Sequence, residues 1–409
     1  MLKMKINLIH YFNIFFIAFC IIWQPFQLYV LHVDAAGRTI MLLSVVAFLL
    51  NFNRILFLFR HTKSVRIWCV LVLYALVNSL LQGYVSEYGA FGFFPVNFTN
   101  PLVFLLIVTL EIQDNCDSCV AVMLVAYLVF LFLGAFHLSG SPFDRVMSEM
   151  GNMLPLTAVA CVFMVAVLFV WKRVRLLSLL LVVAFCLFIV IIAATRKAMG
   201  AIVILLFGVL LARNREGLWV LFIKMLCAFA FFYIAINYVL DNTLIGERIV
   251  SNEEYIPVQM VKNEKLNDFL MIALGDRAIQ YVEGFEVFRE HPVFGIGIGN
   301  YMTYTETDYR LHTEYMVQLC ENGLVGFILL LLFYISVFRG RKRIRAYDRN
   351  FSILLCFGLL AVLFIDFTSW TYDMNYIMSI YGVMIGCSNI NYYENSNLSS
   401  EGLVQRPLD

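Results

Sequence analysis

Long apolar stretches, separated by short polar clusters, recur along most of the chain. A helix needs about 20 mostly apolar residues to cross a bilayer. The sequence therefore predicts an all-α integral membrane protein with about 12 transmembrane helices, because helices satisfy their own backbone hydrogen bonds in lipid. The helices are expected near residues 8–24, 38–56, 65–83, 99–114, 118–137, 153–171, 176–194, 198–212, 218–240, 315–338, 351–368 and 374–388.

Basic clusters between these stretches predict how the helices thread the membrane. Lys and Arg concentrate in cytoplasmic loops. When the predicted helices alternate in direction, every cluster falls on one side, which predicts cytoplasmic N- and C-termini. The clusters are Lys3/Lys5, Arg60/Lys63/Arg66, Lys172/Arg173/Arg175, Arg213/Arg215 and Arg339/Arg341/Lys342/Arg343/Arg345.

One long polar segment divides the predicted helices into two groups. It lies on the side opposite the basic clusters and is expected to be a large periplasmic loop. The tail is polar and lacks the apolar residues that a folded segment buries, so it is expected to be disordered. The predicted organisation is helices 1–9 in residues 1–240, the loop in 241–314, helices 10–12 in 315–390 and a cytoplasmic tail in 391–409.

The large loop is expected to contain amphipathic helices. Asp276 can cap a helix that runs to about Glu290, and Pro292 then prevents its continuation. Apolar residues recur at helical spacing in this segment, which predicts one face that packs on the bundle or the membrane interface. The predicted face consists of Ala278, Tyr281, Val282, Phe285 and Phe288.

Composition agrees with the membrane prediction and excludes other classes. Hydrophobic residues make up 62% of the 409 residues and charged residues only 14%. A soluble domain has about 25% charged residues, so most of this surface must face lipid. The net charge of +1 provides no basic excess to neutralise phosphates, which argues against a nucleic-acid partner.

Three glycines stand close together in HPVFGIGIGNY, residues 291–301. Gly295, Gly297 and Gly299 allow tight turns, and their N–H groups could also form an anion-binding nest. The structural alternative is a tight turn that packs against helix ends. Both interpretations stay open from the sequence.

His312 stands where the predicted loop enters a membrane helix, between Arg310 and Glu314. A histidine with a carboxylate neighbour suits a general base that acts on a sugar hydroxyl. The alternative is an interfacial histidine that bonds to water. Glu321, about two and a half turns further along, is a candidate supporting residue because ionisable groups at membrane depth are costly. Its alternative role is a structural hydrogen bond to a facing helix.

Several cations gather on the predicted outer side. Arg196 and Lys197 interrupt the apolar residues between two predicted helices, and Arg277 and Arg310 lie in the large loop with His312. Arginine forks bind phosphate oxygens in pairs, so these residues suit a pyrophosphate leaving group. The alternative for the first two residues is a membrane-surface anchor.

Motifs for other chemistries are absent from the sequence. It contains no D-x-D for a nucleotide sugar, no Walker loop, no H-E-x-x-H and no nucleophile elbow. Cys116 and Cys119 form a lone C-x-x-C without the second pair that a zinc site needs. The predicted cytoplasmic loops are too short for a nucleotide-sugar domain. A glycosyl donor would therefore be lipid-borne.

These residues resemble the signature of the O-antigen ligase and O-antigen polymerase family of bacterial envelope glycosyltransferases. That signature is His, then Asn, Ser or Gln, nine residues, and Gly-x-x-Gly/Thr/Tyr. His312, the nine residues 314–322, Gly323 and Gly326 match it in spacing, whereas Thr313 departs from the usual amide or serine. The departure weakens an assignment as ligase.

Further elements extend the resemblance over roughly residues 190–340. The stretch HPVFGIGIGN at 291–300 is similar to a family motif, and Thr195–Arg196 and Arg277 match other family positions. The resemblance implies a helical membrane glycosyltransferase without metal or other cofactor, whose donor is an undecaprenyl-pyrophosphate-linked glycan. It further implies that Arg196 and Arg277 hold the pyrophosphate and that His312 acts at the acceptor hydroxyl.

The leading hypothesis is a surface-polysaccharide polymerase in the bacterial inner membrane, which transfers a growing glycan to a lipid-linked repeat unit. The close alternative is a ligase that transfers the finished glycan to lipid A–core or another acceptor. A transporter of the same lipid-linked sugars is disfavoured because no internal repeat is visible. Expected partners are the lipid-linked glycan, a lipid or glycan acceptor, membrane lipids and a chain-length regulator.

Overall fold

The computed structural model is helical in the part of the chain that it describes, where no strand occurs. The all-α prediction is therefore confirmed for these residues. The predicted helix at 218–240, most of the predicted loop and the tail lie outside them. The described residues are 2–26, 36–83, 100–136, 153–193, 195–213, 277–305, 311, 313–367, 369, 371 and 374–389.

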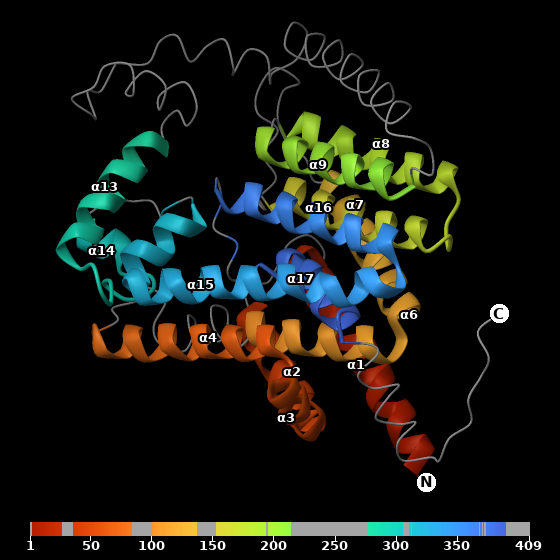
Figure 1. The fold of residues 1–409 in the computed structure, drawn as a ribbon, viewed down its shortest axis with the longest axis horizontal. Helices are drawn as coiled ribbons and strands as arrows, with labels where there is room; N and C mark the ends of the chain where they lie inside the picture. Colours follow the sequence, from red (N-terminus) through yellow and green to blue (C-terminus); the bar gives the residue numbers. More distant parts are fainter. Residues whose placement is uncertain are drawn as a thin grey trace, which may run out of the picture.

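Most described helices coincide with predicted apolar stretches (Figure 1). Their bounds are α1 (Leu2–Phe26), α2 (Ala36–Leu50), α3 (Phe52–His61), α4 (Lys63–Leu81), α6 (Asn100–Phe136), α7 (Met153–Val170), α8 (Leu176–Ile192), α9 (Arg196–Arg213), α13 (Arg277–Glu290), α14 (Tyr301–Thr305), α15 (Glu314–Tyr347), α16 (Arg349–Asp366) and α17 (Asn375–Cys387).

Five of the described helices are long and apolar enough to cross a membrane, and one bent pair would be a sixth. Shorter apolar helices, among them Leu8–Trp23 and Leu176–Ile192, coincide with further predicted spans. These helices support a membrane protein with several spans. The count of twelve and the orientation of the termini stay predictions.

The second predicted span, 38–56, is wrong as a single helix. Helices α2 and α3 meet at an angle of 74°, with Asn51 between them. The Asn51 side chain is buried and donates to Asn13 Oδ1 at 2.7 Å and to Ala47 O at 2.9 Å. The polar residues Asn51, Asn53 and Arg54 mark this position in the sequence, but they do not predict the angle between the two helices.

Helix α6 covers two predicted spans, 99–114 and 118–137. Its backbone leaves the helical conformation at Asn115, with φ −152° and ψ 73°, inside the interval predicted between the two spans. Two helices therefore follow one another here with a kink between them.

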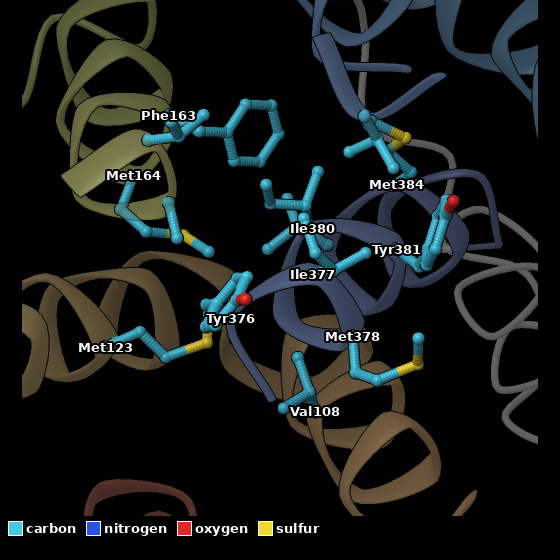
Figure 2. Packing of buried hydrophobic residues seen from close by; sticks show 14 of the residues in the cluster. Val108, Met123, Phe163, Met164, Tyr376, Ile377, Met378, Ile380, Tyr381 and Met384 are labelled. Carbon is cyan, nitrogen blue, oxygen red and sulfur yellow. The ribbon is translucent and has the colours of Figure 1, made fainter. Parts of the chain in front are cut away.

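The core lies where the long helices pack on one another. Helix α4 packs against α15, α9 against α16, and α17 against α6 and α7 (Figure 1). Figure 2 shows Ile377 and Ile380 of α17 between Val108 of α6 and Phe163 of α7. This packing fixes the ends of α9, α15 and α16, where the candidate site residues stand.

Candidate active site

Helix α15 is broken at Gly323. This residue has φ 63° and ψ −166°, a conformation that only glycine adopts readily. A short helix therefore runs from Glu314 to Asn322, and the long helix continues from Leu324. Helix ends leave carbonyl and N–H groups without partners inside the helix, so this break must be satisfied by other segments.

The glycine-rich loop 291–300 supplies part of these partners. Ile296 N donates to Cys320 O at 2.9 Å, and Gly297 N donates to Glu321 O at 2.7 Å. Beyond the break, Leu324 N donates to Pro292 O at 2.9 Å. The loop therefore docks onto the break through backbone hydrogen bonds in both directions.

Helix α4 supplies further partners. Tyr74 OH donates to Asn322 O at 2.9 Å, and the Asn78 amide donates to Glu321 O at 3.0 Å and to Phe294 O at 2.7 Å. The Asn78 side chain thus joins the loop to α15.

Gly295 and Gly323 face one another across this contact. A Cβ on Gly295 would lie 2.5 Å from Glu321 C, and a Cβ on Gly323 would lie 2.6 Å from Gly295 N. The N–H groups of Gly297 and its neighbours bond to α15 and to Ser79 Oγ. The geometry supports the tight turn rather than an anion nest at these residues.

The other two glycines of the predicted set stand beside this contact. Gly299 has φ +81° and lies in the same loop. Gly326 lies in the long part of α15, where a Cβ would meet the Asn322 side chain at 2.2 Å. Close packing around the break therefore accounts for Gly326.

Helix α13 has the predicted extent and ends before Pro292, but its packing face differs from the prediction. Gly284 and Val287 are buried, whereas Phe285 is 53% exposed. Cys320 Sγ donates to Gly284 O at 2.9 Å. Because Gly284 has no side chain, α15 approaches here, and this turns Phe285 away from the bundle.

The short helix α14 is tied to α13 by two tyrosines. Tyr301 OH donates to Glu283 Oε2 at 3.2 Å, and Tyr304 OH donates to the Glu290 carboxylate. The hydrogen bond to Glu290 raises the pKa of the Tyr304 hydroxyl. These bonds hold the loop 291–300 between two helices.

Thr313, which departs from the family signature, has a structural partner in Tyr281 of α13. The Tyr281 hydroxyl lies 2.7 Å from Phe367 O and 3.0 Å from Thr313 Oγ1. A carbonyl only accepts, so Tyr281 donates to Phe367 and Thr313 donates to Tyr281. A hydroxyl at position 313 thus joins the start of α15 to α13 and the end of α16.

Glu314 is buried, and both of its carboxylate oxygens bond to protein groups. Gln318 Nε2 donates to Oε1 at 2.9 Å, and Thr371 N donates to Oε2 at 2.9 Å. Its own backbone N donates to Ser369 O at 3.2 Å. Glu314 therefore joins the start of α15 to the connection between α16 and α17.

Lys197 is not an exposed surface anchor. The residue is 6% exposed, and its ammonium donates to Ser369 Oγ. Arg196 is the first residue of α9, and the side chains of Arg196 and Arg277 lie outside the described part, as do Arg310 and His312. The start of α9 thus lies beside the same α16–α17 connection that bonds to Glu314.

Three helix starts that carry the candidate residues are therefore tied together. Arg196 begins α9, Arg277 begins α13 and His312 stands just before α15. Tyr281 links α13 to α15, and Ser369 links α9 to α15. Helix N-termini carry partial positive charge, which favours an anion there.

Glu321 lies at the break of α15, before the long helix begins, and is 5% exposed. Its backbone carbonyl binds the loop and α4. The predicted supporting residue is thus part of the docking contact, next to the site rather than deep in a continuous spanning helix.

Sequence reasoning missed Asp366, Ser369 and Thr371. All three are buried, and Asp366 accepts from Tyr334 OH at 2.7 Å and from Thr371 Oγ1. The available signal is the polar stretch DFTSWTYD at 366–373, which has many hydroxyl groups for a turn between two membrane helices.

A second polar cluster, also missed, lies among α1, α3 and α6. Glu111 is fully buried and bonds to His10 Nδ1 at 2.5 Å and Asn13 Nδ2 at 2.6 Å. Arg54 lies 3.7 Å from Glu111 and pairs with Asp114. None of the site bonds described above involves this cluster.

Comparison with known proteins agrees with this site. No curated protein matches the chain. Residues 180–331 match a family model described as O-antigen ligase, and this range contains every site residue predicted from the sequence. The resemblance to the O-antigen ligase family is therefore confirmed over residues 180–331.

Proposed function

We propose that this protein is a surface-polysaccharide polymerase of the bacterial inner membrane that acts at the periplasmic face. It transfers a glycan from an undecaprenyl-pyrophosphate carrier to a lipid-linked repeat unit. The family match supports a lipid-linked glycan as substrate in general, and the carrier and acceptor are part of the proposal.

The observation that carries this proposal is the linkage of three helix starts. The starts of α9, α13 and α15 bring the backbone positions of Arg196 and Arg277 and the neighbours of His312 to one group of hydrogen-bonded residues. Two arginine positions at helix N-termini suit a pyrophosphate, which needs several positive groups.

The proposed reaction is a direct displacement. The acceptor hydroxyl oxygen forms a bond to the anomeric carbon of the donor sugar, and the bond from that carbon to the phosphate oxygen breaks. His312 takes the hydroxyl proton. Arg196 and Arg277, with Lys197 and Arg310, stabilise the negative charge that grows on the pyrophosphate, which stays on its undecaprenyl chain.

The ligase is the second candidate, because the matched model is described as O-antigen ligase. The sequence favours a polymerase through the departure at Thr313. Since the Thr313 hydroxyl bonds to Tyr281, local packing also accounts for this residue, and the acceptor must be decided by experiment.

The first experiment is the surface-glycan profile of cells that lack the gene, with lipid-linked and finished glycan analysed separately on gels. A single repeat unit on the final acceptor, without a ladder, supports the polymerase. Long chains that accumulate on the carrier support the ligase. An unchanged profile would refute both and favour transport or another envelope polymer.

Variants then test the proposed residues. His312→Ala is expected to abolish chain extension while the protein still inserts, and normal glycan length would remove His312 from the mechanism. Arg277→Lys should be severely impaired because lysine keeps the charge but loses the paired donors. Arg289→Lys, at an exposed position of the same helix, is the matched control and should leave the profile unchanged.

A further inference from the structure

The connection between α16 and α17 is more buried and more extensively bonded than a surface turn. Ser369 is 5% exposed and Thr371 is 2% exposed. Their described hydrogen bonds reach three helices: Lys197 of α9, Glu314 of α15 and Asp366 of α16. Both residues lie outside the range that matches the family model.

Ser369 lies between two buried charged residues. Its hydroxyl accepts from the Lys197 ammonium, and its carbonyl accepts from the backbone N of Glu314. A buried charge is costly unless hydrogen bonds satisfy it. Ser369 therefore favours one relative placement of the start of α9 and the start of α15.

Thr371 fixes the same connection from the other side. Its backbone N–H donates to Glu314 Oε2, and its hydroxyl donates to Asp366 Oδ1. Asp366 is fully buried and also accepts from Tyr334. The connection is therefore held by carboxylates of two helices as well as by the lysine.

We infer that Ser369 and Thr371 are positioning residues for the proposed transfer. They fix the start of α9, which carries Arg196, relative to the start of α15 at Glu314, two residues after His312. The inference rests on the proposed function, because the leaving group and the acceptor hydroxyl must be held together for displacement. A misplacement of about 1 Å can lower a rate by about 100-fold.

The test is steady-state kinetics of the purified full chain in proteoliposomes. The probe is the lipid-linked repeat units that accumulate in cells lacking the gene. Ser369→Ala removes one acceptor of the Lys197 ammonium and is expected to lower kcat about tenfold or more, with KM for the donor nearly unchanged. Ser369→Thr keeps the hydroxyl and should restore most of kcat.

Ser352→Ala is the matched control. Ser352 is 1% exposed, makes one described side-chain bond to Arg341 O, and stands near the opposite end of α16. Ser369→Ala should unfold at a lower temperature than Ser352→Ala, because it removes a partner of a buried ammonium, so kcat is compared per folded enzyme. If Ser369→Ala loses stability but keeps the kcat of the folded enzyme, or matches Ser352→Ala in kcat, the positioning role is refuted.

Failure of the proposed function gives a different pattern. Wild-type protein that does not extend the repeat units, with His312→Ala indistinguishable from it, would overturn the transfer reaction and the positioning role together. Active wild type, inactive His312→Ala and unchanged Ser369→Ala would overturn the positioning role alone.

A second measurement does not need activity. Maleimide labelling of the full-length His312→Cys variant, resolved by peptide, reports the surroundings of this position. Ser369→Ala should change this labelling rate, whereas Ser352→Ala should not. Equal labelling rates in His312→Cys alone, with Ser369→Ala and with Ser352→Ala would contradict the inference.

Discussion

Gly323→Ala tests whether the break in α15 is held by the glycine loop. The added Cβ would lie 2.3 Å from Val293 O and 2.6 Å from Gly295 N. Backbone atoms cannot rotate away as a side chain can, so the loop must shift. The shift strains the bonds from Ile296 N, Gly297 N and Leu324 N.

The expected cost has two parts. Placing alanine in the conformation of Gly323 costs about 1–3 kcal/mol. Loss of two of these three hydrogen bonds adds about 1–3 kcal/mol, at about 0.5–1.5 kcal/mol each. The contact between the loop and α15 should therefore weaken by about 2–6 kcal/mol.

Gly83→Ala separates the two parts. Gly83 also has a positive φ, +73°, but a Cβ there would meet no atom within 4 Å. It should carry only the conformational cost, about 1–2 kcal/mol. Gly295→Ala should weaken the contact about as much as Gly323→Ala, because its Cβ would meet the backbone of α15 at Glu321.

Cys320 provides a local assay. Its thiol is fully buried and bonds to Gly284 O, next to the break. Labelling of a buried thiol follows the population of the locally opened state, and 1.4 kcal/mol corresponds to about tenfold. Gly323→Ala should raise the Cys320 labelling rate about 30-fold or more.

Cys161 of α7 is fully buried in the main core and serves as the internal reference. Its labelling rate should stay unchanged in both variants. Equal Cys320 labelling rates in Gly323→Ala and Gly83→Ala would refute the conclusion that the facing glycines hold the loop on α15.

Three further predictions concern buried polar groups. Glu111→Ala removes the buried carboxylate that bonds to His10 and Asn13. At about 1.5–3 kcal/mol for each bond to a charged group, the free energy of unfolding should fall by about 3–6 kcal/mol. Asp114→Ala, on the 46% exposed partner of Arg54, should cost less than about 1 kcal/mol, and equal losses in detergent unfolding would contradict this. In a double-mutant cycle of Tyr281→Phe and Thr313→Val, unfolding should show a coupling of about 0.5–1.5 kcal/mol, and strict additivity would exclude the bond between the two hydroxyls. Thr313→Asn restores the usual family residue and should leave the class of glycan product unchanged, because Thr313 bonds to Tyr281; a switch between polymer and ligated product on gels would show that position 313 selects the acceptor.

Helix positions could be predicted where a single long apolar stretch decides them. Helix α7, Met153–Val170, agrees with the predicted span 153–171 to one residue, because almost every residue in it is apolar and packed. The extent of α13 followed from Pro292, whose effect on the backbone is local. Local signals of this kind do not depend on the rest of the fold.

The two internal bends could not be predicted in the same way. At Asn51 the chain bends from α2 to α3, and the Asn51 side chain donates a hydrogen bond to Asn13, 38 residues earlier in the sequence. Gly323 breaks α15 because a loop about 30 residues earlier supplies hydrogen-bond partners. Short polar runs stand at both positions, Asn51 to Arg54 and Glu321 to Gly323, but a polar run does not say whether a helix bends there or continues.

The candidate site was also predictable only where local sequence signals decide it. The predicted cations and His312 were selected from the sequence by residue type and by the spacing of the family signature. It did not bring together Glu314, Ser369, Thr371 and Lys197, because these contacts join segments from three regions of the chain. Thr371 shows the difficulty clearly, since its backbone N–H, which sequence does not distinguish, binds the Glu314 carboxylate.

The fixed spacing of the family signature has a physical reason in this structure. The nine residues between Thr313 and Gly323 form one short helix, about 13.5 Å long at 1.5 Å per residue. Glu314, Gln318 and Asn322 repeat every fourth position, and their side chains form a continuous hydrogen-bonded series. One end of this series binds Thr371 at the site, and the other stands at the break that receives the glycine loop. A residue added or removed would rotate one end by about 100° relative to the other, so the site and the loop contact could not both form.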